Sequence, residues 1–220
     1  MKRVILGVAL ALCIFGSPSL AAESTLFDGR IESLANGWAH ANYETSGKSA
    51  RAAEAAKVAA EAAALARQCP GRAEPLVWEA IAKATQGGAE GGMGALGLVK
   101  QARTLLEQAE RIDPKALGDG SVYTSLGSLY AQVPGFPLGF GDAGKARAYL
   151  QKALAANPTG IDPNFFYGDF LMRQGDYAGA ITALERAVAA PPRPGRAVAD
   201  RGRRAEAAAL LTEAKAKRHA

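Results

Sequence analysis

The sequence is poor in the side chains that build most catalytic and metal sites. Its 220 residues include two cysteines, Cys13 and Cys69, and two histidines, His40 and His219. The histidines are far apart in the chain, so a two-histidine metal site would require unrelated segments to meet. The strings G-x-S-x-G, H-E-x-x-H, S-x-x-K and C-x-x-C are all absent. We therefore expect no catalytic residues, no metal ligands and no cofactor, and the sequence does not predict an enzyme.

Long hydrophobic runs are limited to one, at the start of the chain. A basic start, the apolar stretch Val4–Phe15 and small residues after it are typical of a secretory signal. They predict a signal peptide over residues 1–22 and a soluble periplasmic protein. A lipid anchor at Cys13 is the competing interpretation, but the residue before this cysteine is leucine and not a small residue. Once the signal is removed, Cys69 has no partner for an intrachain disulfide.

One glycine-rich string resembles a nucleotide-binding turn. Gly92–Gly97 has the G-x-G-x-x-G spacing, in which glycines let the backbone approach a pyrophosphate at a helix N-terminus. Such a turn must follow a strand, whereas the preceding Pro75–Thr85 has helical spacing and no β-branched run. We therefore expect no cofactor here, and we interpret the glycines of residues 86–97 as a flexible or tightly turned loop.

Small residues, by contrast, are abundant and recur in a fixed pattern. The spacing Ala-x3-Leu-x2-Ala-x4-Pro occurs three times. Positions four and seven residues apart share one stripe of a helix, and each proline marks a point by which the helix has ended. With 49% hydrophobic and 7% aromatic residues, the chain favours close helix packing over a bulky aromatic core. The copies are Ala102, Leu106, Ala109 and Pro114; Ala146, Leu150, Ala153 and Pro158; and Ala180, Leu184, Ala187 and Pro192.

A second helical pattern precedes each copy of this spacing in the sequence. Each repeat unit is therefore expected to be a hairpin of two helices. In the third unit Asp162-Pro163 begins a helix and Gly175-Asp176 separates it from the next. The interval from Ala146 to Ala180 is 34 residues, the period of a tetratricopeptide repeat. The third unit resembles this repeat most closely, and the other two resemble it with longer inner turns. Further residues at signature places are Trp78, Ile81, Tyr123, Leu126, Gly127, Tyr130, Gly168 and Tyr177.

The resemblance implies an all-α fold, a right-handed α-solenoid of about four helical hairpins plus a C-terminal capping helix. We expect a repeat domain over residues 23–192 and a basic capping helix over residues 193–220. The expected hairpins are at about 25–70, 73–114, 118–158 and 161–192. Residues 86–97 and 133–142 lengthen equivalent turns, so both segments should project from the same side of the array.

In arrays of this family the first helix of each hairpin lines the concave surface. Its positions outside the repeat signature are free to recognise a partner. They mix both charge signs with an aromatic residue and a methionine, which suits a peptide or protein segment. These candidate partner-binding residues are Glu79, Lys83, Thr124, Ser128, Gln132, Phe165, Asp169, Met172 and Arg173.

The loop over residues 133–142 is a second candidate surface. Phe136 and Phe140 stand among prolines and glycines, which makes the loop stiff and apolar. Local packing over the neighbouring hairpin is the favoured interpretation, because a surface loop usually buries its large apolar groups. Binding of a partner is the alternative.

The last segment of the chain is strongly basic. Residues 193–220 carry eight basic and three acidic side chains, a net charge of +5, whereas the body of the chain is nearly neutral. A solvated cap on the terminal repeat is the favoured interpretation. Docking on an acidic partner or on lipid phosphates is the alternative, and nucleic acid is not expected because the segment lacks interleaved aromatic residues.

Two functions remain open from the sequence. The leading hypothesis is a periplasmic scaffold that binds a protein or peptide partner in its concave groove. The alternative is an accessory carrier of a small apolar ligand, since the chain distantly resembles the T component of TRAP-type uptake systems.

Overall fold

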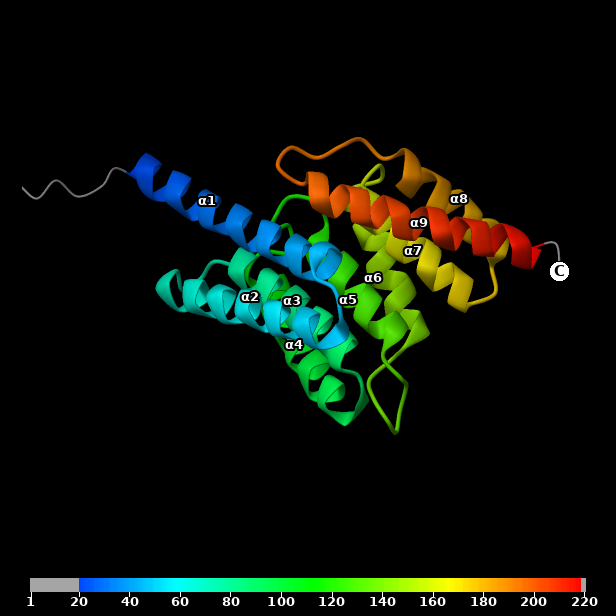
Figure 1. The fold of residues 1–220 in the computed structure, drawn as a ribbon, viewed down its shortest axis with the longest axis horizontal. Coiled ribbons are helices and arrows are strands. Elements are labelled where there is room, and N and C mark those ends of the chain that lie inside the picture. Colours follow the sequence, from blue (N-terminus) through cyan, green and yellow to red (C-terminus); the bar gives the residue numbers. More distant parts are fainter. Residues whose placement is uncertain (1–19, 219–220) are drawn as a thin grey trace, which may run out of the picture.

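The fold is an array of antiparallel helices (Figure 1). A computed structural model describes residues 20–218, and the predicted signal peptide lies outside this range apart from residues 20–22, which belong to the first helix. Within the described range all the regular elements are helices, so the predicted all-α solenoid is confirmed. The elements are α1 (Leu20–Ala39), the π-helix η1 (His40–Glu44), α2 (Lys48–Gln68), α3 (Glu74–Glu90), α4 (Gly92–Ile112), α5 (Ser121–Gln132), α6 (Ala143–Ala156), α7 (Ile161–Arg173), α8 (Tyr177–Ala189) and α9 (Ala197–Arg218).

The repeated small residues form the seams of the hairpins. Every alanine and leucine of the three-copy pattern is at most 1% exposed. Glycines of the opposite helix face them: a Cβ atom on Gly127 would lie 2.6 Å from the Leu150 side chain, and one on Gly168 would lie 2.7 Å from Leu184. Because these positions leave no room for a methyl group, the two helices of each hairpin approach closely.

The breaks between helices follow the local sequence. Gly175 adopts a positive φ of 76° after α7, and the Asp176 side chain then accepts a hydrogen bond from the Gly179 backbone N–H at 2.9 Å. Asp142 caps α6 in the same way, through the Lys145 backbone N–H. These aspartates satisfy N–H groups that have no partner within the first turn.

The predicted loop over residues 86–97 is wrong. Helix α3 continues to Glu90 and α4 begins at Gly92, and the turn between them is made by Gly91 and Gly92, each with φ at 67°. A Cβ atom on Gly87 would lie 3.2 Å from the Ala95 carbonyl oxygen, so glycine permits close contact between the two lengthened helices. Tertiary packing outweighs the roughly 1 kcal/mol per residue by which glycine disfavours a helix. The insertion thus extends the hairpin, and the G-x-G-x-x-G string forms the first turns of α4 after a helix.

The two ends of the array meet. Helix α9 packs along α8, and its first turns also contact η1 and α1 (Figure 1). Ala199 of α9 belongs to the same buried cluster as Phe27 and Trp38 of α1. The Tyr43 hydroxyl of η1 donates a hydrogen bond to Glu206 of α9 at 3.2 Å. The terminal segment therefore reaches the first hairpin, and the expectation of a solvated outer cap is wrong for this part of the segment.

None of the helices between residues 20 and 218 is both long and apolar enough to cross a bilayer. No group of three or more histidine, cysteine or carboxylate side chains in this range could hold a metal ion. Cys69 is half-buried and carries a free thiol.

Candidate functional site

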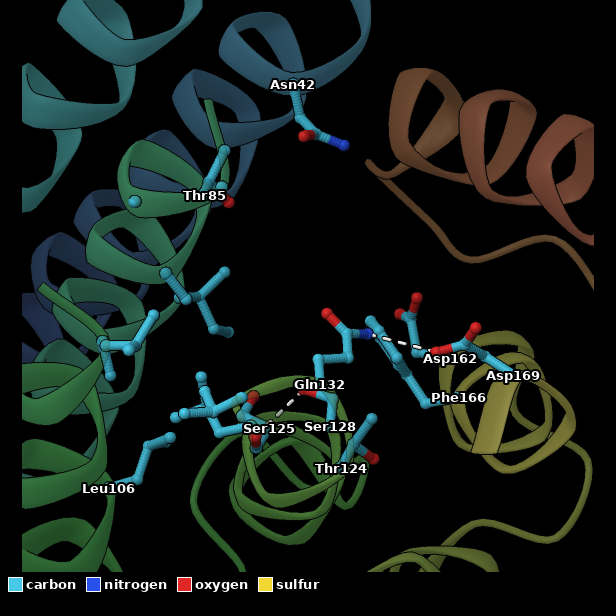
Figure 2. A pocket seen from close by; sticks show the side chains of 18 of the residues that line it. Asn42, Thr85, Leu106, Thr124, Ser125, Ser128, Gln132, Asp162, Phe166 and Asp169 are labelled. Carbon is cyan, nitrogen blue, oxygen red and sulfur yellow. Dashed lines mark hydrogen bonds between the residues drawn. The ribbon is translucent and has the colours of Figure 1, made fainter. Parts of the chain in front are cut away.

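A cavity of about 800 Å³ occupies the inner face of the array. Helices α3 and α4 form one wall, α5 and α7 form the opposite wall, and α9 covers one end (Figure 2). The loop after α5 lies at the other end, where it contributes Val133, Pro134 and Leu138 to the lining. The cavity volume falls in the range of about 300–1,000 Å³ that is typical of ligand sites.

The wall from α3 and α4 is apolar. Most of the side chains that face the cavity here are apolar, and they recur three or four residues apart along each helix. Thr85 is a polar exception, and its hydroxyl accepts a hydrogen bond from the Trp38 indole N–H. This wall presents Ile81, Ala84, Leu96, Val99 and Leu106 to the cavity. A ligand of this site must therefore bury an apolar surface against it.

The wall from α5 and α7 is polar. The Gln132 side-chain amide donates to the Asp169 carboxylate at 3.3 Å, and Arg173 Nε donates to the same carboxylate at 3.0 Å. Ser128 donates to the backbone carbonyl of Ser125, and Figure 2 shows both serines beside Gln132 on the cavity side of α5. These groups form a row of donors and acceptors that faces the apolar wall.

The end of the cavity under α9 contains a network of buried charges. The Asp162 carboxylate accepts hydrogen bonds from Arg193 Nη1 at 2.7 Å and from Arg203 Nε at 2.8 Å. Arg193 also pairs with Asp200, and Arg203 also pairs with Glu206. Burial opposes ionisation of Asp162, but the two guanidinium groups outweigh it and hold the pKa of this carboxyl below its ordinary value. Arg193 and Arg203 of the basic segment thus fix that segment to α7 instead of being solvated.

Arg196 differs from Arg193 and Arg203, because its side chain forms no hydrogen bond or ion pair with the described residues. Its guanidinium lies 5.1 Å from the ring centre of Trp78, and both residues line the cavity. Arg196 Nε and Trp78 Nε1 are buried without a hydrogen-bond acceptor. Burial and the nearby Arg193 lower the pKa of Arg196. By comparison, the indole N–H of Trp38 donates to the Thr85 hydroxyl at 2.9 Å.

Asp119 lies at the same end of the cavity. Burial raises the pKa of this carboxyl, and its Oδ1 accepts a hydrogen bond from the Ser121 backbone N–H at 2.9 Å. The covered end therefore presents unpaired donors, from Arg196 and Trp78, close to a carboxyl group.

Most of the residues predicted for the groove line this cavity. Thr124, Ser128, Gln132, Phe165, Asp169 and Arg173 do so. The Thr124 hydroxyl is, however, already engaged with the Gly120 carbonyl at 3.0 Å. Glu79, Lys83 and Met172 do not line the cavity.

Glu79 and Lys83 were predicted to face the groove, but they lie outside the cavity lining, on another side of α3. The residues of α5 and α7 that line the cavity are three or four positions apart. On α3 the lining residues with this spacing are Trp78, Ile81 and Thr85. Glu79 and Lys83 pair with each other at 3.6 Å, and Lys83 reaches Gln101 of α4. Met172 lies in the main hydrophobic core. Applying the α5 spacing to α3 would have given the correct face from the sequence.

The loop residues separate into two roles. Phe140 packs edge-on against Tyr130, with ring centres 5.6 Å apart, and the Arg103 guanidinium lies 4.4 Å from its ring centre. Phe136 is 94% exposed. The expectation of local packing is therefore correct for Phe140 and wrong for Phe136.

These features define a class of protein, an α-solenoid of helical hairpins with a cavity on its inner face. A family model described as tetratricopeptide repeat matches residues 138–200. A solved structure, that of the thermophilic TPR protein TTC0263 from Thermus thermophilus, is 19% identical, covers 86% of this chain and 90% of its own, and has a TM-score of 0.53. A search of curated proteins gave no match. Residues 138–200 are thus tetratricopeptide-repeat sequence, and the described chain has the fold of a tetratricopeptide-repeat protein.

Proposed function

We propose that this protein is a non-catalytic interaction module that binds an extended segment of a partner protein in the cavity between α3, α4, α5 and α7. The observation that carries the proposal is the pairing of an apolar wall with a row of polar groups across one continuous cavity. An extended peptide presents side chains alternately to two sides and can satisfy both walls at once.

The dimensions of the site fit a short segment. Helix α5 has 12 residues, and at about 1.5 Å per residue it is about 18 Å long. At about 3.3 Å per residue, an extended chain of about five residues spans that length. At the covered end the segment would supply a hydrogen-bond acceptor to Arg196, whose buried Nε has no acceptor among the described residues.

A small amphipathic ligand is the second candidate. Coverage of one end by α9 favours it, because small-molecule sites enclose most of the ligand surface. In this case the protein would act as an accessory carrier, as the distant resemblance to the T component of TRAP-type systems implies. We place either activity in the periplasm, on the strength of the predicted signal peptide.

One pair of variants tests the site. Ser125→Trp fills the cavity from α5, whereas Thr182→Trp adds the same side chain at an exposed position on α8. Wild-type protein and both variants would be screened against a library of displayed random heptapeptides, with affinities measured by fluorescence polarisation. We expect the selected peptides to bind wild type and Thr182→Trp equally and to lose at least tenfold in affinity for Ser125→Trp. Equal affinity for both variants would show that the peptides bind elsewhere.

Native mass spectrometry of protein extracted gently from the periplasm separates the second candidate from the first. A bound mass of a few hundred daltons, kept by Thr182→Trp and lost by Ser125→Trp, would favour the carrier. Spectra of the unliganded mass alone would count against it.

A further inference from the structure

The loop after α5 ends in an apolar tip that the rest of the molecule does not cover. Phe136 is 94% exposed and Leu138 is 72% exposed. The loop projects beyond the helices on the same side as the turn between α3 and α4 (Figure 1). Exposure of two large apolar side chains on one loop is unusual, because burial of such groups strongly favours the folded chain.

The backbone of the loop is braced, so the tip does not fold back. The Gly141 N–H donates to the Pro134 carbonyl at 2.9 Å and closes the loop across its base. Within the tip, Leu138 and Gly139 both donate to the Gly135 carbonyl at 3.1 Å. The base is held in turn by Phe140, which packs against Tyr130 of α5. The fold therefore presents Phe136 outward and leaves Leu138, which lies at the rim of the cavity, 72% exposed.

Cations surround the base of the tip. The Lys145 ammonium lies 5.3 Å from the ring centre of Tyr130, and the Arg147 guanidinium lies 5.1 Å from that of Phe170. The residues at the loop base and Phe170 line one shallow pocket, so both cations are close to the loop. Both side chains are exposed, and none of the described carboxylates lies within ion-pair distance of them.

The acidic neighbours of the tip are already engaged. The Asp142 carboxylate caps α6 through the Lys145 backbone N–H. Glu107 pairs with Arg103 at 3.4 Å. The tip therefore combines exposed aromatic and aliphatic side chains with two cations that contact aromatic rings and form no ion pair with the described carboxylates.

We propose that this loop inserts Phe136 and Leu138 into the surface of a bilayer that contains anionic lipids. Lys145 and Arg147 then face the lipid phosphates. Aromatic side chains favour the boundary between headgroups and acyl chains, and basic side chains near it add attraction to anionic lipids. An apolar pocket on a partner protein would match the tip, but it would leave the two cations beside the tip without an anionic partner. Charge complementarity therefore favours an anionic lipid surface. This inference does not rest on the function proposed for the cavity.

The first test is sedimentation of the full chain with vesicles. Vesicles of phosphatidylcholine alone would be compared with vesicles of phosphatidylcholine and phosphatidylglycerol at a ratio of 2:1. We expect binding to the anionic vesicles to fall at least tenfold for the double variant Phe136→Ser/Leu138→Ser. We expect a reduction of at least about fivefold for Lys145→Glu/Arg147→Glu. Ile112→Ser is the matched control, because Ile112 is also exposed but lies at the far end of α4.

The second test places a probe in the tip itself. Trp38 and Trp78 are buried, so the introduced tryptophan of Phe136→Trp can be followed by quenching with brominated phosphatidylcholine in the anionic vesicles. We expect strong quenching for Phe136→Trp and little for Ile112→Trp. Absence of quenching at position 136, or unchanged binding of the serine double variant, would overturn the proposal. Equal binding to neutral vesicles would overturn the role given to the cations.

Discussion

Replacing Asp162 by asparagine should strongly destabilise the fold. This carboxylate accepts hydrogen bonds from both Arg193 and Arg203, and it joins the first turn of α7 to the terminal segment. Asparagine keeps the size of the side chain and one acceptor but removes the charge. Arg203 is only 9% exposed, so it would lose its main counter-charge inside the protein.

The magnitude follows from this geometry. Removing one partner of a fully buried ion pair costs about 3–5 kcal/mol. The Asp162 side chain is 24% exposed, and Arg203 keeps its contact with Glu206, so the lower part of that range applies. Loss of a negative charge from the first turn of a helix adds a few tenths of a kcal/mol. We expect the free energy of unfolding to fall by about 2–4 kcal/mol.

The assay is urea denaturation followed by circular dichroism at 222 nm, with Asp176→Asn as the matched control. Asp176 caps α8 on the surface, and asparagine caps a helix about as well as aspartate, so this variant should change the free energy of unfolding by less than about 0.5 kcal/mol. If Asp162→Asn lost no more stability than Asp176→Asn, the buried network would not be holding α9 in place.

The same variant has a predictable dependence on pH. Because the pKa of Asp162 is lowered in the folded protein, its stabilising contribution is fully present above its unfolded value of about 3.9 and is lost as the pH falls through the folded value. The stability difference between wild type and Asp162→Asn should therefore be constant from pH 5 to pH 7 and shrink below about pH 4. A difference that persisted undiminished at pH 2 would contradict the role of the ionised carboxylate.

Three further predictions concern packing and titration. Gly127→Ala should lower the free energy of unfolding by about 1–3 kcal/mol, because the new methyl group would clash with Leu150 of α6. Gly97→Ala, at an open position on α4, should raise the free energy of unfolding by up to about 1 kcal/mol. Thermal melts of both variants check this. Phe140→Ser should lower the melting temperature by several degrees and Phe136→Ser should leave it nearly unchanged, since only the first side chain packs locally; similar losses for both would contradict the exposed tip. Burial first, and then the adjacent Glu110 carboxylate, raise the pKa of Tyr149 to about 12 in the folded protein. Since the unfolded chain ionises this phenol at lower pH, the wild type should lose more stability than Tyr149→Phe as the pH rises from about 10 to 12. Alkaline unfolding curves that ran parallel for the two proteins would refute this.

The hairpins could be predicted because their determinants are local. The alanines and leucines that recur four and seven positions apart in the sequence are the buried seams of α4, α6 and α8. Gly175 and Asp176 form the turn between α7 and α8, where the sequence pattern predicted it. Periodicity and turn chemistry act over a few residues, so they can be read without knowing what lies across the fold.

The prediction of a loop over residues 86–97 was wrong because its determinants are not local. Gly87 and Gly88 disfavour a helix on their own, and the sequence therefore predicted a loop. In the structure the segment is helical, because a residue without a side chain lets α3 lie close to the start of α4. The helix propensity of one segment does not include the contacts that this segment makes with another helix.

On α5 and α7 the repeat register predicted positions most of which line the cavity. Six of the nine groove positions line the cavity, including Gln132 and Asp169, which the structure joins by a hydrogen bond. The choice of Glu79 and Lys83 failed because a shift of one or two residues turns a helical side chain by about 100–200°. Arg196 and Trp78 are far apart in the sequence, and only the fold brings their unpaired donors to one end of the cavity.

The sequence by itself determined that the chain forms helical hairpins, that α7 ends and α8 begins at Gly175-Asp176, and which small residues lie in the seams. Only the tertiary structure decided that α9 returns to the first hairpin, that arginines predicted to be solvated pair with Asp162 and Asp200, and that the inner face becomes a cavity covered at one end. Helix formation and turns depend on neighbours within about one or two helical turns. The ion pairs join residues up to 41 positions apart, and their geometry exists only once the array has closed.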